Sequence, residues 1–169
     1  VNCHAYDYSN VISNKKNSID YNKKNKFIVY LDNGGPYFTG DLHLNNVNLR
    51  VNDTEYYYKE LNLFFDKLEK LFGKKIIVIP HPKYKKTKLK TKNLNPYHCN
   101  RVTDNTYDAA CKLIPNSLFV LTDRGSTAIS FGIIHSKPIQ IIYSSNYNYL
   151  KTEFEDMKVL SKEIGGKLV

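Results

Sequence analysis

Four short stretches of the chain are dominated by apolar residues and lack the alternation of a strand with one wet face. They are Phe27–Leu31, Lys75–Ile79, Leu118–Thr122 and Pro138–Tyr143. Strands that are buried on both faces of a parallel sheet have this pattern. We therefore expect four strands of a mostly parallel sheet, with helices covering both of its sides.

Helical periodicity lies between and after these strands. Apolar residues repeat every three or four positions from Tyr57 to Phe72, behind Asn52 and Glu55 in capping-box spacing. Gly73 follows as a left-handed stop. Further helices are expected over Asp104–Leu113, Thr127–His135 and Tyr149–Ile164. Alternating strands and helices predict an α/β fold, a Rossmann-like domain of three layers.

Length and composition limit the organisation of the chain. Its 169 residues suffice for one domain, which we place at 26–169 behind a polar linker or arm at 1–25. No apolar run is long enough for a membrane helix, and no signal peptide is visible. The three cysteines are widely spaced and form no C-x-x-C pair. A reducing, cytoplasmic setting is therefore expected, without a disulfide framework.

The net charge of +9 is concentrated in one segment. Six of the lysines lie close together, at Lys83, Lys85, Lys86, Lys88, Lys90 and Lys92. Such a run forms a solvated loop, or it contacts a polyanion such as a nucleotide, an anionic lipid or a nucleic acid. Nucleic acid is the less favoured partner, because the run contains no arginine and Tyr84 is its only aromatic residue.

Three turns fall at the carboxyl ends of expected strands, where ligands of parallel sheets bind. His81 lies between Pro80 and Pro82, which restrict its backbone. Its imidazole can contact a phosphate, donate a proton to a leaving group, or serve only as a structural hydrogen-bonding group. Asp32 can take a proton from an acceptor hydroxyl, or only cap the turn that Gly34 permits.

The third turn is Gly125-Ser126-Thr127, between a strand and a helix. Unpaired N–H groups of the first helical turn, with two hydroxyls beside them, can hold a phosphate. Alternatively, Ser126 or Thr127 only caps the helix. The other histidines are scattered without ligand spacing, so no metal site is expected.

Three segments together resemble the C-terminal half of bacterial surface-polysaccharide glycosyltransferases of the GT-B type. These segments are Tyr58–Phe65, Ile77–Pro82 and Gly125–Ile139, within a resemblance that covers about residues 27–143. The His-Pro and Ser-Ser/Thr elements are similar to those of bacterial sialyltransferases. The resemblance implies that the domain is one half of a GT-B architecture.

The resemblance also implies roles for individual residues. His81, next to Pro82, becomes a phosphate ligand or leaving-group acid, and Ser126 and Thr127, after Gly125, become phosphate donors. Asp32 becomes the base, although Asn33 stands where the family has a second acidic residue. Arg124 is added from its position, as a group that neutralises phosphate charge.

The implied function is the donor-binding domain of a glycosyltransferase that builds capsule or lipopolysaccharide. Its substrate would be a nucleotide sugar, a CMP-linked one among the options, and no metal or other cofactor is expected. A glycan or glycolipid acceptor would bind an N-terminal domain, so this chain alone is expected to be an incomplete, inactive fragment. It would lie in the cytoplasm, with peripheral contact to the anionic inner membrane as an option. The alternatives are a sugar-nucleotide epimerase, a polyol-phosphate transferase and a non-enzymatic polyanion binder acting through the segment Lys83–Lys92.

Overall fold

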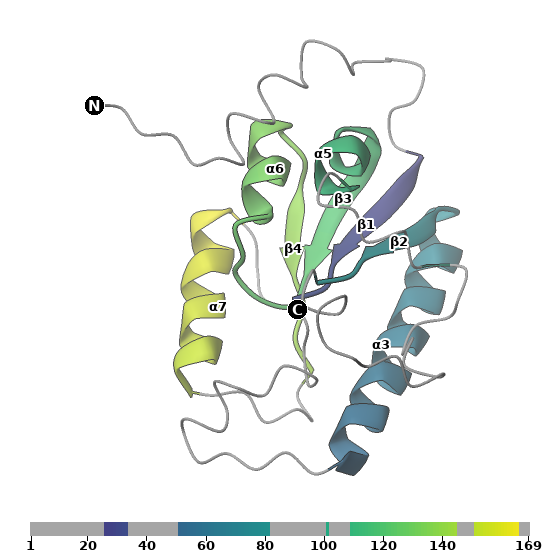
Figure 1. Ribbon diagram of the computed structural model, residues 1–169, viewed down its shortest axis with the longest axis vertical. Helices are drawn as coiled ribbons and strands as arrows, with labels where there is room; N and C mark the ends of the chain where they lie inside the picture. The colour runs from purple at the N-terminus through teal and green to yellow at the C-terminus, as the bar shows by residue number, and fades with distance from the viewer. Residues whose placement is uncertain (1–25, 34–50, 82–100, 102–108, 145–150, 166–169) are drawn as a thin grey trace.

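The computed structural model describes residues 26–33, 51–81, 101, 109–144 and 151–165. Within them, four parallel strands form a sheet of order β2-β1-β3-β4 (Figure 1). The strands are β1 (Phe27–Leu31), β2 (Lys75–Ile79), β3 (Ser117–Thr122) and β4 (Ile139–Ile141). All four predicted strands are confirmed, although β4 is shorter than predicted. The predicted arm at 1–25 and the lysine run lie outside the described residues.

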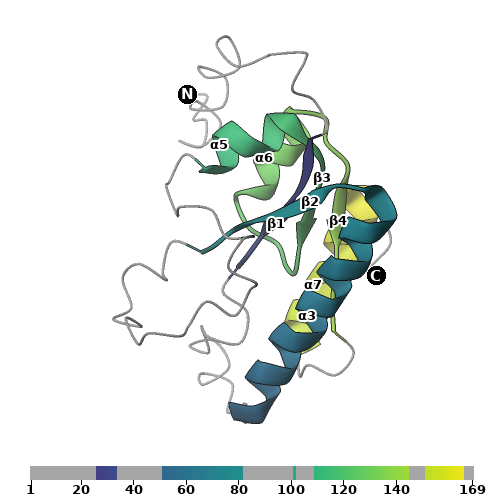
Figure 2. The same cartoon turned by 90° about the vertical axis from the view of Figure 1, so that its right-hand side faces the viewer.

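Helices cover both faces of the sheet and complete three layers (Figure 2). One side carries α3 (Val51–Phe72) and α7 (Lys151–Glu163). The other side carries α5 (Ala109–Leu113), followed by the short 3-10 helix η3 (Ile114–Asn116), and α6 (Ile129–Ile134). The predicted α/β class with a parallel sheet is confirmed.

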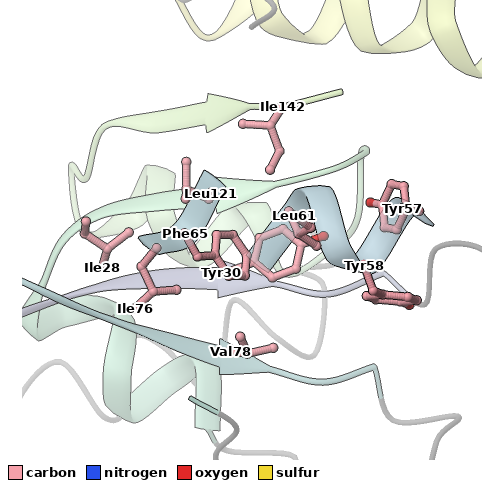
Figure 3. Packing of buried hydrophobic residues seen from close by; sticks show 10 residues of the cluster. All are labelled: Ile28, Tyr30, Tyr57, Tyr58, Leu61, Phe65, Ile76, Val78, Leu121 and Ile142. Atoms are coloured by element: carbon pink, nitrogen blue, oxygen red, sulfur yellow. The ribbon is translucent and has the colours of Figure 1, made fainter. Parts of the chain in front are cut away.

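Two apolar clusters explain why the strand sequences do not alternate. Successive residues of β1 point to opposite faces, so Ile28 and Tyr30 pack with α3 while Val29 packs on the α5 and α6 side. Tyr30 meets Phe65 of α3 edge-to-face, with 5.1 Å between the ring centroids. Figure 3 shows the cluster under α3, formed by Ile28, Tyr30, Tyr57, Tyr58, Leu61, Phe65, Ile76, Val78, Leu121 and Ile142. Both faces of the central strands therefore take up apolar side chains, so apolar residues follow one another along the strand.

Helix boundaries follow the sequence less closely than strands do. Helix α3 begins at Val51, so Asn52 lies inside it and the prediction of an N-cap at this residue is wrong. Its end is as predicted, since Gly73 has a φ of 60° and so adopts the left-handed conformation that glycine tolerates. The helix predicted to start at Asp104 is described only from Ala109 onward.

A buried arginine fastens α3 to the edge strand β2. Arg101 Nη2 lies 2.6 Å from Asp66 Oδ1 and 2.6 Å from Glu69 Oε2, both on α3. Glu69 Oε1 accepts a 2.8 Å hydrogen bond from the backbone N–H of Ile76 on β2. The carbonyl of Arg101 accepts another, of 2.8 Å, from the N–H of Val78. We refer to Arg101, Asp66 and Glu69 as the Arg101 clasp.

Candidate functional site

The order of the strands defines a topological switch point between β1 and β3. The chain leaves β1 through α3 and returns as β2 on one side, whereas β3 lies on the other side of β1. The connections after β1 and β3 therefore diverge to opposite faces of the sheet, and open parallel sheets bind ligands at this place. We call Thr122, the last residue of β3, together with the residues that follow the two strands, Asp32, Asn33, Asp123 and Arg124, the switch-point edge.

The side chain of Asn33 joins the two sides of this edge. Its Nδ2 donates to Thr122 Oγ1 at 2.8 Å and to Asp123 Oδ1 at 2.9 Å, and lies 3.3 Å from the carbonyl oxygen of Arg124. The Thr122 hydroxyl in turn donates to that carbonyl at 2.8 Å. These contacts follow from strand register, because Leu31 pairs with Thr122 and the next residues of each strand emerge side by side.

Both aspartates of the edge are buried. Asp123 is 2% exposed, and its second carboxylate oxygen, Oδ2, accepts a 3.4 Å hydrogen bond from the Tyr57 hydroxyl of α3. Arg124 Nε lies 4.0 Å from the same oxygen. Asp32 is 4% exposed, and its backbone N–H donates to the carbonyl of Ile79 at 3.1 Å. The edge therefore holds two acidic side chains below the surface, with neutral donors and one guanidinium around Asp123.

These acidic groups act on the tyrosine beneath them. Burial raises the pKa of Tyr30 well above its ordinary value of 10.0, and the negative charge of Asp123 raises it further, followed by smaller effects of Tyr57 and Asp32. The Tyr30 phenol therefore stays protonated at neutral pH. Figure 3 shows Tyr57 toward the arrow ends of the strands, at the edge that carries the aspartates.

The turn after β3 differs from the expected helix terminus. Helix α6 begins at Ile129, two residues beyond Thr127, and its N-cap is Ala128, without a side-chain capping bond. The alternative in which Ser126 or Thr127 caps this helix is therefore wrong, and the helix predicted to start at Thr127 starts later. The N–H groups of Ile129, Ser130 and Phe131 donate to the carbonyls three residues earlier, at 3.1, 3.1 and 3.2 Å. These three N–H groups are used within the turn, so for them the expectation of unpaired N–H groups pointing outward is wrong.

Hydroxyl and guanidinium groups remain at this turn. The Ser126 Oγ is buried and has no hydrogen-bond partner within the described part of the chain, whereas the Thr127 side chain is exposed. Arg124 is partly buried next to them. Gly125 packs against α7, since a Cβ added there would lie 3.2 Å from Leu160 Cδ2. Its missing side chain thus serves helix packing.

His81 lies at the same edge on the other side of β1. It follows the end of β2 by two residues and is partly buried, while Pro82 lies outside the described residues. The ends of β2 and β3 are separated by β1, which amounts to two strand spacings or roughly 10 Å. The sheet thus brings His81, Asp32 and the turn from Arg124 to Thr127 to one edge, but on two sides of β1.

Sequence reasoning missed two members of the edge, Thr122 and Asp123, and also Tyr57 of α3, which contacts Asp123. Thr122 and Asp123 directly follow an apolar run at the ligand-binding end of a strand, which is the same signal that identified Asp32. Tyr57 gave no separate signal, because it also belongs to the apolar face of α3.

Two features are absent from the described residues, a metal-binding cluster and a membrane-spanning helix. Among these residues, no group of three or more His, Cys, Asp or Glu side chains is arranged to hold a metal ion. No helix in the described ranges has both the length and the apolar character needed to cross a bilayer.

Comparison with known proteins gave no relative. No family model matches the chain, and no curated protein or solved structure matches it. Its function therefore has to be argued from the switch-point edge.

Proposed function

We propose that this domain binds a nucleotide-linked sugar at the switch-point edge, as the donor-binding domain of a glycosyltransferase for capsule or lipopolysaccharide. The observation that carries the proposal is the coincidence of the topological switch point with polar residues that the fold buries there. Asp32 and Asp123 are both buried where the loops after β1 and β3 diverge. Nucleotides bind open parallel sheets at such points. The glycosyl-transfer part rests on the resemblance of the His-Pro and Ser-Thr segments.

The charges at the edge determine where the phosphate and where the hydroxyl groups of the ligand can bind. A phosphate is repelled by the buried Asp123 carboxylate, so it belongs on the outer side of the turn, where Arg124, Ser126 and Thr127 supply a cation and two hydroxyls. His81 approaches from the side of β2. Hydroxyls of the ribose or the sugar are the groups that can donate hydrogen bonds to the carboxylates.

Glycosyl transfer at this edge needs three events. The bond between the anomeric carbon and the phosphate oxygen breaks, and that oxygen takes the bonding electrons, its growing charge being stabilised by Arg124 and by a proton from His81. The acceptor oxygen forms the new bond to the anomeric carbon. Its proton passes to Asp32, which is 4% exposed, so the acceptor hydroxyl has to come within hydrogen-bond distance of this buried carboxylate.

The binding part is tested by titrating CMP, CDP, UDP and GDP into the isotope-labelled chain and following backbone amides by NMR. We expect at least one nucleotide to shift the amides of Asn33, Arg124 and Ser126, and inorganic phosphate alone to shift them less. Shifts that are scattered over the surface, or no shifts with any of the four nucleotides, would refute a nucleotide site here.

Ser126→Ala gives a sharper version of this test. The Ser126 hydroxyl makes no hydrogen bond within the described residues, so its removal should leave stability nearly unchanged. A hydrogen bond to a charged phosphate is worth about 1.5–3 kcal/mol, so its loss should weaken nucleotide binding about 10-fold or more. Lys158→Gln, at an exposed pair on α7, is the control for unspecific attraction of the anion by the basic chain. Unchanged affinity in Ser126→Ala would remove this residue from the site.

The reaction class is tested on the product of the complete reading frame, supplied with CMP-, UDP- and GDP-sugars and a glycolipid acceptor. Sugar transferred to the acceptor supports the proposal. An epimerised nucleotide sugar formed without acceptor would support the epimerase alternative, and a polyol phosphate linked to the acceptor would support the polyol-phosphate transferase. Binding to RNA or anionic liposomes that needs the lysines at 83–92 would instead favour the polyanion binder.

A further inference from the structure

We propose that Asn33 is a positioning residue of this site. Its side-chain amide fixes the turn after β3 against the end of β1, and so determines where Arg124 and Ser126 meet the phosphate of a bound nucleotide. The inference rests on the proposed function for its ligand, but the positioning itself can be measured in the free protein.

The geometry of Asn33 is that of a bridge between two strand ends. The two hydrogens of its amide nitrogen can serve Thr122 Oγ1 at 2.8 Å and Asp123 Oδ1 at 2.9 Å, groups that lie 89 and 90 residues away in the sequence. The Thr122 hydroxyl then donates to the carbonyl of Arg124 at 2.8 Å. Amide, hydroxyl and carbonyl thus form a continuous chain in which each hydrogen bond strengthens the next. The chain ends two residues before Ser126.

The chemistry of this position requires an uncharged double donor. Asn meets the requirement, because its NH2 group supplies two hydrogens without adding charge. An aspartate here would place a second carboxylate about 2.9 Å from that of Asp123 and would supply no hydrogen at neutral pH. The Thr122 hydroxyl would also turn toward the new carboxylate and away from the carbonyl of Arg124. Both effects would move the turn that carries the proposed phosphate ligands.

The position of Asp123 shows that this turn is tied to the sheet and to a helix at once. One of its oxygens accepts from Asn33, after β1, and the other accepts from the Tyr57 hydroxyl of α3 at 3.4 Å. If Asn33 no longer donates, only the longer Tyr57 contact of this pair remains to hold Asp123. The turn should then follow Asp123 toward α3.

The experiment compares Asn33→Asp with Asn116→Asp. Asn116 lies at the opposite edge of the sheet, before β3, and within the described ranges its side chain makes one hydrogen bond, of 3.5 Å, to the Lys112 carbonyl. It therefore receives the same chemical change without the network. In the free protein, Asn33→Asp should shift the amides of Arg124, Gly125 and Ser126, and Asn116→Asp should not. With whichever of CMP, CDP, UDP and GDP the wild type binds best, we expect Asn33→Asp to raise Kd at least 10-fold and Asn116→Asp to leave it within 2-fold.

Two further measurements separate positioning from a loss of folding. In the variant Asn33→Asp/Asp123→Asn the donor and acceptor are exchanged, so part of the lost affinity should return. In the single variant Asn33→Asp, the adjacent Asp123 carboxylate raises the pKa with which this carboxyl pair takes up a proton. Lowering the pH from about 8 to about 5 should then restore a donor between the two groups, and the affinity relative to wild type should rise. Among the described residues, the charged and titratable groups around this position are Asp32, Asp123, Arg124, Tyr57 and Tyr30, which both proteins share.

The outcomes distinguish the two proposals. If the wild type binds no nucleotide, the proposed function fails, while the amide shifts of the free protein still decide whether Asn33 positions the turn. If those shifts do not appear in Asn33→Asp, the positioning role is refuted. If the wild type binds and Asn33→Asp binds equally well, with no dependence on pH, the inference is wrong and the proposed function stands.

Discussion

Replacing Arg101 by methionine tests the contact that holds α3 to the sheet edge. Arg101 is 5% exposed, and its guanidinium contacts two carboxylates of α3 at 2.6 Å. It also lies over the ring of Phe65, 5.7 Å from the centroid. Methionine keeps an apolar chain of similar length over that ring and removes the charge. Arg101→Met therefore isolates the ionic part of the Arg101 clasp.

The size of the effect follows from how deeply each partner is buried. Removing one member of a fully buried ion pair costs about 3–5 kcal/mol, because the remaining charge is left without compensation. Here the Asp66 side chain is 48% exposed and that of Glu69 is 26% exposed, so water can solvate both carboxylates after the substitution. We expect a loss of about 2–3 kcal/mol of unfolding free energy, which is about 5–10 °C in Tm for a chain of this size.

Urea unfolding followed by circular dichroism, with thermal unfolding beside it, measures this loss. The matched control is Lys158→Met. It removes the cation of an exposed pair, in which Lys158 Nζ lies 3.0 Å from Glu155 Oε1 and also over the ring of Phe154. A surface pair of this spacing contributes a few tenths of a kcal/mol, so the control should change stability by less than about 0.5 kcal/mol.

Equal stability of Arg101→Met and Lys158→Met would refute the reasoning. It would mean that the cost of burying the guanidinium cancels its attraction to the carboxylates, as happens when some buried ion pairs are replaced by apolar residues. Arg101→Lys adds a second check. A lysine keeps one charge but cannot contact both carboxylates with a planar fork, so its loss should lie between zero and that of Arg101→Met.

Acid, alkali and a backbone substitution test three other features. Partial burial would raise the pKa of Glu69, but hydrogen bonds from Arg101 and the Ile76 N–H outweigh this and hold it below its ordinary value of 4.5. The contribution of Glu69 to the free energy of unfolding is therefore present above pH 4.5 and is lost as the pH falls further. Glu69→Gln should make the free energy of unfolding less dependent on pH in acid, and an unchanged dependence would contradict this. Burial raises the pKa of Tyr30, whose contribution is complete below pH 10.0 and declines above it. Tyr30→Phe should remove that alkaline decline in urea melts, and an unaltered slope would show another group to be its cause. Gly73→Ala, at a φ of 60°, should cost about 1–2 kcal/mol, and Gly73→Asn distinctly less; equal losses would exclude backbone strain as the reason.

The sheet could be predicted from the sequence because the signal for a strand buried on two faces is local. Four or more successive apolar residues form the signal, as in Ile76–Ile79 after the exposed Lys75. The stop of α3 at Gly73 was equally local. The start of α6 could not be predicted locally. Ser126 and Thr127 have the residue types of helix caps, whether their hydroxyls or their backbone carbonyls accept the first hydrogen bonds of the helix. Here the backbone carbonyls accept the bonds.

The site could be predicted only in part, because its contacts depend on strand register. Asp32 and the 125–127 turn were placed at one edge by the rule for parallel sheets. That Asn33 meets Asp123 follows only once Leu31 is paired with Thr122, a pairing across 91 residues that no local pattern reveals. The same holds for Arg101, whose carboxylate partners precede it by 32 and 35 residues. Long-range polar pairs are therefore what the sequence left unpredicted.

The two polar clusters of this domain differ in a way that bears on function. In the Arg101 clasp, a full positive charge lies 2.6 Å from each carboxylate, and the cluster joins α3 to β2. A structural role is therefore sufficient to explain these charged residues. At the switch-point edge, Asp123 is more deeply buried than Asp66, yet among the described residues the neutral groups of Asn33 and Tyr57 hold it, and Arg124 Nε lies 4.0 Å from its Oδ2. An apolar residue would serve folding at least as well there, because burying a charge without a close countercharge lowers stability. A buried aspartate at this point is explained if a bound ligand donates further hydrogen bonds to its carboxylate. The same inference predicts that nucleotide binding should raise the Tm of the wild type more than that of Asp123→Leu.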